Sequence, residues 1–494
     1  MTENKPASQK KNTNYFYLIS FALIAIAVGL TWTPWANTKV GVLDILPSVW
    51  NTATETLTSQ GISIFAFAFF LYAILESKAF EALFVSQRKW LEKRKYLAIG
   101  LITVTVALLS ANLSWFDEFV HFYPLVIPLF LAMGFDFFSA LLCLYGGSIV
   151  GLIGLVSPER MEKFLKAQCG IGESVKFNSL SGSGFRLLFF ALFTAILVLF
   201  NIWYCSRIQQ KKAISDDDLN KEKSSYPFNK TRKFILVIAG FFLLVSVFSQ
   251  FAPISRKIES TKITENVPDL VTSEQKKTKY EDLGVIGKEG KKIAKKEEEA
   301  ESYWEKFGSW SSRSLDCWFI IGGITICLLA KLDLVKTFIG AAQNSLPLIF
   351  VYILAAAPAD IIKNSGLSNS LAENVLSENI ASSAGFWFLV TIFGLSTLIS
   401  FFICSTSITA ALVSVSAPAL LAISSQTLIY AAIFSWVGGI LGMAFSPANG
   451  ILVASLERSE TSYKQFIKKT WVFWAIVTTV VFGLVFYWAK FVIK

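Results

Sequence analysis

The sequence predicts an all-α polytopic membrane protein with inverted repeats and about 11–13 hydrophobic segments, some of them forming interrupted helices or re-entrant hairpins. Two observations lead to this fold class. Of the 494 residues, 54% are hydrophobic, and many runs of mostly apolar residues are long enough to cross a bilayer core. In addition, polar breaks, prolines and glycine-rich stretches follow one another in the same order in both halves of the chain.

The first apolar segment follows a lysine-bearing start but is long and lacks a clear A-x-A cleavage site, so we expect a retained span and not a signal peptide. Several later segments are too short for ordinary spans and flank polar breaks at 114–118 and 404–407. Each such pair is expected to be a helix interrupted in the membrane or a re-entrant hairpin. The expected segments are residues 15–33, 60–77, 97–113, 119–133, 136–156, 185–205, 232–251, 314–332, 338–361, 381–403, 408–424, 426–445 and 470–491.

Residues 252–313 interrupt the apolar pattern with dense mixed charge, including the run KEGKKIAKKEEEAE. We expect an exposed, partly helical or disordered insert, because this composition cannot bury enough apolar surface to fold by itself. The insert divides the chain into an N-terminal membrane half, 1–251, and a C-terminal half, 314–494. It is either a solvated connector or a docking or sensing module.

The two halves repeat one order of features. FDE is followed by Pro128 and by GGSIVGLIGLVSP, which contains Ser157, and CSTS is followed by Pro418 and by GGILGMAFSP, which contains Ser446. A repeat displaced by seven segments, an odd number, must cross the membrane in the opposite sense. Inverted repeats with interrupted helices are typical of secondary transporters, whose site lies near the midplane where the repeats meet.

The loops carry the topological information. Residues 78–96, 206–231 and 446–469 are rich in Lys and Arg, whereas 34–59 and 363–380 are slightly acidic. The positive-inside rule therefore predicts a cytoplasmic N-terminus, the three basic loops inside and the charged insert outside. The expected location is the bacterial plasma membrane, with multiple spans.

Composition excludes several classes of function. The formal charge of +10 is spread over the loops and forms no basic stripe, so we expect no nucleic-acid partner. The only histidine is His121, the six cysteines show no C-x-x-C spacing, and no P-loop is present. We therefore expect no metal site, no cofactor and no enzymatic activity, and the expected partners are a small-molecule substrate and the lipid bilayer.

Asp117 and Glu118 lie side by side within an otherwise apolar stretch. A carboxylate at the centre of a bilayer costs about 2.5–3.5 kcal/mol, so an adjacent pair needs partners or water and marks a candidate substrate site. The alternative is that this break surfaces as a short extracellular loop. Tyr123 and His121 follow on the same face by helical spacing, and His121 could relay protons or pair with an acid.

The second break contains only hydroxyl side chains, those of Ser405, Thr406, Ser407 and Thr409. A broken helix exposes unpaired amides at its N-terminus, which favours an anion such as a substrate carboxylate. The alternative is that these hydroxyls only complete the backbone hydrogen bonding of a kinked helix.

FDEFVHFYPLVIPLFLAMGFD resembles the YfcC-type (ArcD-like) family of basic amino-acid antiporters, which includes arginine/ornithine exchangers and is related to the DcuC C4-dicarboxylate carriers of the ion-transporter superfamily. That family reads approximately MAEETxxFYPLxIPxMLAxGYD at this position. The likeness continues at SGSGFRLLFF, at CSTSITAALVSVSAP and at SPANGILVA, which adds Ser446 and Asn449 to the expected substrate-binding residues. Departures concentrate in the second half, where Cys404 replaces a proline, and Gly439 and Met443 replace the family's Asp and Asn.

The resemblance implies a plasma-membrane antiporter that exchanges basic amino acids by alternating access, with Asp117 and Glu118 selecting the cationic side chain, and it implies a homodimer. A C4-dicarboxylate or another small organic acid is the alternative cargo. Such a cargo needs positive charge in the site, and no Arg or Lys lies inside the expected core. A non-transporting receptor or scaffold that uses residues 252–313 is the second alternative.

Overall fold

The computed structural model describes residues 7–113, 115–154, 164, 183–208, 228–251, 254–265, 296–307, 312–375, 385–423 and 425–491. The chain divides into two compact units. The first, called the membrane unit below, comprises Met1–Leu243 and Ser312–Lys494, and the second, the insert unit, comprises Leu244–Ser311.

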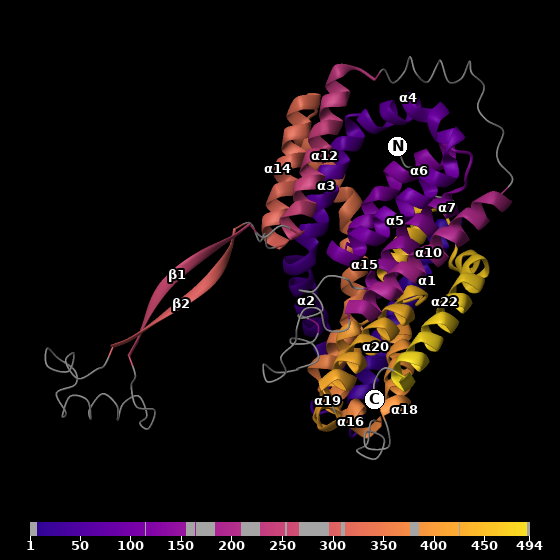
Figure 1. Ribbon diagram of the computed structural model, residues 1–494. Coiled ribbons are helices and arrows are strands. Elements are labelled where there is room, and N and C mark those ends of the chain that lie inside the picture. Colours follow the sequence, from indigo (N-terminus) through magenta and orange to yellow (C-terminus); the bar gives the residue numbers. More distant parts are fainter. Residues whose placement is uncertain are drawn as a thin grey trace. The chain divides into compact units, whose positions relative to one another are not determined.

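All regular structure described in the membrane unit is helical (Figure 1). The N-terminal half contains α1 Ala7–Thr31, α2 Ile45–Thr56, α3 Ile62–Glu76, α4 Ala79–Lys93, α5 Lys95–Leu113, the 3-10 helix η3 Glu118–Phe122, α6 Tyr123–Ala132, α7 Phe137–Leu141, the π-helical turn η4 Leu142–Gly146, α8 Gly147–Gly154, α10 Ser183–Arg207 and α12 Lys230–Phe251. The C-terminal half contains α14 Ser312–Ala330, α15 Leu334–Asn364, α16 Leu367–Val375, α18 Gly385–Ile403, α19 Thr406–Ile423, α20 Ser425–Ala444, α21 Gly450–Arg458 and α22 Tyr463–Phe491.

The predicted fold class is confirmed. Each apolar segment expected from the sequence contains a helix. Among the described residues, six helices are long and apolar enough to cross a membrane, or seven if the bent pair formed by α3 and the first part of α4 counts as one span. The sequence did not reveal α2, α4, α16 and α21, which lie in segments predicted to be loops.

The insert unit contains strands that the sequence analysis did not predict, and the expected partial disorder stays a prediction. Its described residues include two antiparallel strands, β1 Ile254–Glu265 and β2 Lys296–Phe307, paired from Ile254 opposite Phe307 to Glu265 opposite Lys296. The sequence of β1, ISRKIESTKITE, is rich in Ile and Thr, which favour strands. Reading the segment by its charge alone concealed this local preference.

The first predicted break is a helical hairpin. The Tyr96 ring, at the start of α5, lies 6.2 Å from the ring of Phe135, just after α6, so the two helices run antiparallel. Together η3 and α6 form an apolar helix of fewer than 18 residues, Glu118–Ala132, which is too short to cross a bilayer. The tip between α5 and η3, described at residues 115–117 and called the first tip, therefore lies within the membrane unit.

The second break is also a hairpin. Helices α18 and α20 run in the same direction, because Ser396 donates a hydrogen bond to Ser435 (3.1 Å) while Phe401, farther along α18, lies against Gly442. Helix α19 runs the opposite way, since Ser435 also donates to the Thr409 carbonyl. Only Cys404 and Ser405, called the second tip, separate α18 from α19.

Two pairs of helices, one in each half of the chain, pack in the same way. Helix α5 packs closely against α8, because a Cβ atom on Gly151 of α8 would collide with the Ala107 carbonyl of α5. Helix α18 packs against α20 in the same way, because a Cβ atom on Gly442 of α20 would collide with the Thr397 carbonyl of α18. In Figure 1 the α5–α6 hairpin occupies the upper part of the membrane unit and the α18–α19 hairpin the lower part. The two hairpins therefore enter from opposite ends.

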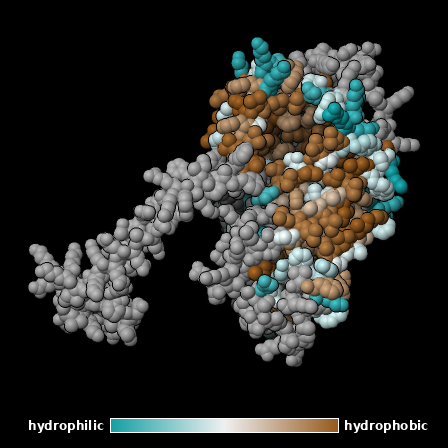
Figure 2. Space-filling model, viewed as in Figure 1, coloured by the Kyte–Doolittle hydropathy of each residue, from teal (hydrophilic) through white to brown (hydrophobic). Residues whose placement is uncertain are grey.

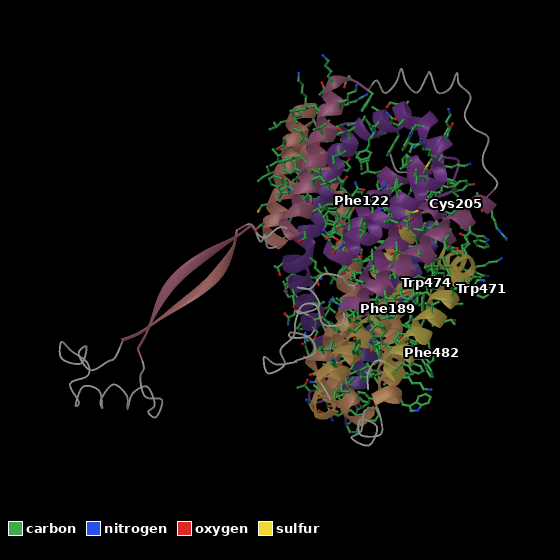
Figure 3. The ribbon with its side chains drawn as sticks, in the orientation of Figure 1. Phe122, Phe189, Cys205, Trp471, Trp474 and Phe482 are labelled. Carbon is green, nitrogen blue, oxygen red and sulfur yellow. The ribbon has the colours of Figure 1, made fainter. Side chains whose placement is uncertain are left out.

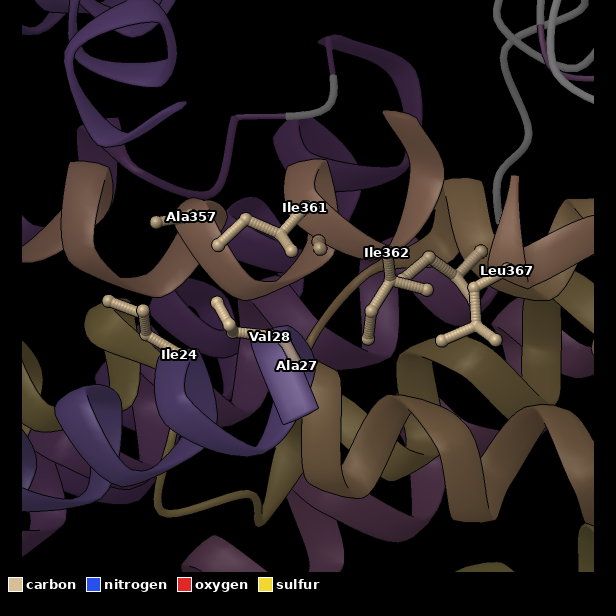
Figure 4. Close-up of a cluster of buried hydrophobic side chains, with 9 residues drawn as sticks. Ile24, Ala27, Val28, Ala357, Ile361, Ile362 and Leu367 are labelled. Carbon is tan, nitrogen blue, oxygen red and sulfur yellow. The ribbon is translucent and has the colours of Figure 1, made fainter. Parts of the chain in front are cut away.

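Helix α15 is the central element of the unit. Its 31 residues pack against α1, α2, α3 and α21. Figure 4 shows one such contact, where Ile24 and Val28 of α1 meet Ala357 and Ile361 of α15. Ile408 of α19 belongs to the same buried cluster, so this cluster supports the second tip.

The outer surface matches a lipid environment. Figure 2 shows a broad hydrophobic area on the face in view, with hydrophilic residues toward the ends. Exposed apolar side chains of this kind, such as Leu199 and Leu328, are expected where acyl chains replace water.

Residues from the three predicted basic loops or their edges meet at one end of the unit. The Lys95 ammonium lies 5.6 Å from the Phe135 ring centre, while Asp136 accepts a hydrogen bond from Tyr204 and lies 3.6 Å from Lys469. The predicted loop 446–469 is nevertheless wrong in part, because its first half forms the buried helix α21. Which side of the membrane this end faces stays a prediction.

The close helix pairs can be tested by overpacking. We expect Gly151→Val and Gly442→Val each to lower the free energy of unfolding by about 1–3 kcal/mol, because the added side chain meets backbone that cannot move aside. The thermal midpoint of purified protein in detergent measures this effect. Gly394→Val is the matched control, since a Cβ on Gly394 of α18 meets nothing within 4 Å. Equal shifts in all three variants would contradict the packing role.

Candidate functional site

Asp117 and Glu118 lie at the first tip and are both partly buried. The Tyr352 hydroxyl of α15 donates a hydrogen bond to Asp117 Oδ1 (3.1 Å), and Glu118 Oε2 accepts one from the Phe116 amide (3.1 Å). The neighbouring Trp115 is buried. The tip is thus packed against other parts of the membrane unit, and its acids are held by specific donors. Whether it lies within the bilayer or surfaces as an extracellular loop stays a prediction.

His121 and Tyr123 follow the acids but face other groups. His121 is buried, and its Nε2 atom forms no hydrogen bond with any residue that the structure describes. It lies close enough to Arg458 for their charges to interact. The Tyr123 hydroxyl is buried beside Ser455, without forming a hydrogen bond of acceptable geometry.

The residues of the second break take two roles. Thr409 donates to the Thr406 carbonyl of its own helix (2.9 Å), so its hydroxyl only completes backbone hydrogen bonding. Ser405 and Thr406 are partly exposed, and their hydroxyls make no hydrogen bond within the described residues. The side chain of Ser407 lies outside the described part of the chain. The second tip therefore presents two available hydroxyls at the N-terminus of α19.

Cys404 explains the sharpness of this tip. It adopts a left-handed backbone conformation, with φ of 54°, which reverses the chain between α18 and α19 within two residues. L-residues enter this region at a cost, and the surrounding contacts must hold it. Its thiol lies close to the side chain of Ser446, which anchors the tip to the break after α20.

Ser446 and Asn449 organise that break. Ser446 donates to the Phe401 carbonyl (2.5 Å), near the end of α18. Asn449 is the N-cap of α21: its Oδ1 accepts from the amides of Ile451 and Leu452, and its Nδ2 donates to the Met443 carbonyl. In the structure both side chains form hydrogen bonds with backbone groups, and their predicted role in substrate binding stays a prediction.

Tyr145 joins the two repeats and was not identified from the sequence. Its hydroxyl donates to the Ala444 carbonyl at the end of α20 (2.7 Å) and lies 3.4 Å from Asn449 Nδ2. Its ring lies 6.1 Å from the ring of Phe116 at the first tip. The surrounding run LLCLYGG is apolar and gives no signal for a polar function. Trp436 forms a second link by donating to the Leu152 carbonyl.

A cavity of about 150 Å³ opens where α3, η3, α15 and α21 meet. Its polar lining comes from Tyr72, His121, Asn344 and Arg458. The Arg458 guanidinium donates to the Asn344 carbonyl (3.2 Å), and the Asn344 side chain donates to the Gly340 carbonyl. The expectation that no Arg or Lys lies inside the core is therefore wrong. Arg458 had been assigned to a loop, because the short helix α21 is not recognisable by length.

The link through Tyr145 can be tested by a double-mutant cycle. Tyr145→Phe and Asn449→Ala each remove part of one buried network, so we expect their effects on stability to be non-additive by about 0.5–3 kcal/mol. Thermal or denaturant unfolding in detergent gives the four values of the cycle. Tyr145→Phe combined with Thr479→Ala is the control pair, because Thr479 is exposed and bonds only within α22. Additivity in both cycles would show that the hydroxyl and the amide do not act together.

An uncharacterised protein of Haemophilus influenzae is 23% identical over 210 residues, and the match spans 40% of each chain. The solved structure of Neisseria gonorrhoeae MtrF, described among a class of antimetabolite efflux pumps, is 12% identical and covers 97% of this chain and 94% of its own, with a TM-score of 0.42. The Alcanivorax borkumensis YdaH transporter is 14% identical, with coverage of 98% and 99% and a TM-score of 0.42.

The profile of one family extends over almost the whole chain. It is the C4-dicarboxylate anaerobic carrier family, DcuC, and it matches residues 20–489, including both hairpins. The narrower resemblance to basic amino-acid antiporters stays a prediction. The chain belongs to the DcuC family of C4-dicarboxylate anaerobic carriers and is a multi-pass membrane protein.

Proposed function

We propose that the protein is a secondary transporter of small organic acids, with C4-dicarboxylates as the leading substrate class. The observation that carries this proposal is Arg458, a cation on the buried helix α21 that lines the cavity beside His121. The sequence offered one objection to an anionic cargo, the absence of a cation in the core, and the position of α21 removes it. The family name points to the same substrate class.

The positive charge of Arg458 favours an anionic substrate. A carboxylate about 4 Å from a guanidinium gains about 4 kcal/mol at an effective dielectric constant of 20, before desolvation is subtracted. Arg458 is pre-positioned by its bond to the Asn344 carbonyl, so little of this gain is lost in ordering the side chain. Tyr72 and the Asn344 side chain lie in the same lining and could contact a second carboxylate. A cavity of about 150 Å³ suits a solute of a few carbon atoms.

The hairpin tips supply the second part of the proposal. Ser405 and Thr406 present free hydroxyls together with the first amides of α19, which stabilise negative charge. Alternating access then requires the two hairpins, which enter from opposite ends, to open in turn around a fixed central region. The direct links at Tyr145 and Trp436 are contacts that such a motion must preserve or exchange.

Exchange of basic amino acids is the second candidate. The observation that favours it is the position of Asp117 and Glu118, both partly exposed at the first tip beside Tyr352. In this arrangement the two acids would select a cationic side chain and the second tip would hold the carboxylate. We also propose that the basic end of the membrane unit and the N-terminus face the cytoplasm and that the transporter is a homodimer, as the resemblance implies.

Counterflow in proteoliposomes separates the two substrate classes. We expect wild-type protein to exchange a C4-dicarboxylate, and Arg458→Gln to reduce this exchange at least tenfold, which corresponds to about 1.4 kcal/mol of lost substrate stabilisation. Asp117→Asn and Glu118→Gln should leave dicarboxylate exchange within a few-fold of wild type. Arg94→Gln, an exposed cation outside the cavity, is the matched control.

The opposite pattern would support the second candidate. Exchange of arginine or ornithine that falls tenfold in Asp117→Asn or Glu118→Gln, with Arg458→Gln unaffected, would replace the dicarboxylate proposal. Absence of both activities in folded wild-type protein would refute both cargoes and favour a receptor or scaffold.

A further inference from the structure

A second cavity, of about 330 Å³, lies between the end of α10 and the beginning of α22. None of the residues of the two tips or of the Arg458 cavity lines it. Its polar and aromatic lining comprises Trp203, Tyr204, Arg207, Lys468, Lys469 and Trp471. Figure 3 labels Cys205 of α10 and Trp471 of α22, which mark the two helices that bound this groove.

The groove carries an excess of positive charge. The Lys469 ammonium donates a hydrogen bond to the Tyr204 hydroxyl (2.8 Å) and lies 3.6 Å from a carboxylate oxygen of Asp136. It also lies 4.3 Å from the Phe138 ring centre. Within the described residues, neither Arg207 nor Lys468 forms an ion pair with a carboxylate. Among the residues that the structure describes, one carboxylate thus faces three cations, which leaves a net attraction for an anion.

The aromatic residues locate the groove relative to the membrane. The Arg207 guanidinium stacks over the Trp203 ring, 4.6 Å from its centre, while Trp203 and Trp471 are 44% and 62% exposed. Tryptophans at such positions are typical of the membrane–water interface. Both α10 and α22 are long and apolar enough to span a membrane.

The groove therefore has a polar end and an apolar end. The apolar side chain of Val472 contributes to the lining, and Leu199, one turn from Trp203 on α10, is 67% exposed. A free inorganic anion would use only the cationic end. A phospholipid would use both, with its phosphate between Arg207 and Lys468 and its acyl chains along α10.

We propose that this groove binds the phosphate group of an anionic membrane lipid. Basic pockets between membrane helices on the cytoplasmic side are suited to such headgroups, because clustered cations and a negatively charged leaflet attract each other. The fixed position of Lys469 orients the site, and Arg207 and Lys468 supply two cations that form no ion pair with any described carboxylate. The lipid would hold α22 against α10 at the end where both helices meet Asp136.

Native mass spectrometry of protein purified in neutral detergent tests the proposal directly. Protein is incubated with an equimolar mixture of phosphatidylglycerol and phosphatidylcholine, and the retained lipid adducts are counted. We expect wild type to retain phosphatidylglycerol preferentially, and the double variant Arg207→Gln/Lys468→Gln to retain it about tenfold less. The double variant Lys93→Gln/Lys336→Gln removes two exposed cations from α4 and α15, outside the groove, and should behave like wild type.

A thermal midpoint measurement separates the lipid from a free anion. Phosphatidylglycerol should raise the midpoint of wild type and of the Lys93/Lys336 control, but should raise that of the groove variant by less than half as much. Inorganic phosphate at the same concentration should have no effect. Equal lipid retention by the groove variant and the control would overturn the proposal, and so would a stabilisation by inorganic phosphate as large as that by the lipid.

Discussion

A helix that ends inside a membrane leaves backbone amides and carbonyls that lipid cannot satisfy, and this constraint shapes the centre of the protein. The chain breaks at the first tip, at the second tip and after α20. At each break a side chain replaces the missing backbone partner: Glu118 accepts from the Phe116 amide, Ser446 donates to the Phe401 carbonyl, and Asn449 caps α21. Two of these partners, Ser446 and Asn449, are fully buried, and Glu118 is partly buried.

The same constraint explains why the repeats are joined so closely. The Ala444 carbonyl, left free where α20 ends, receives its hydrogen bond from Tyr145 of the other repeat. Gly151 and Gly442 let each hairpin approach its supporting helix until backbone meets backbone. A tip held in this way is a precise arrangement of polar groups in an apolar surrounding, which is what recognition of a small charged solute requires.

Charge inside the membrane unit follows a related rule. A buried ion is tolerated when it has partners, and the described ions near the centre meet this condition: Asp117 has the Tyr352 hydroxyl and Arg458 has the Asn344 carbonyl. The acid and the cation lie on opposite repeats, at the first tip and on α21. The centre can therefore offer either a negative or a positive charge to a solute. For this reason both an anionic and a cationic substrate are candidates.

The sequence by itself determined which long apolar segments are helical and where the hairpins break, because apolar length and polar interruption are local properties of the chain. It also marked Asp117, Glu118, Ser405 and Thr406, since polar residues in apolar surroundings stand out. Only the tertiary structure decided the roles of Tyr145 and Arg458. Tyr145 lies in an unbroken apolar run and Arg458 ends a nine-residue helix, so no local pattern signals them. Their functions arise from contacts with residues that are distant in sequence, and such contacts exist only once the two repeats have packed together.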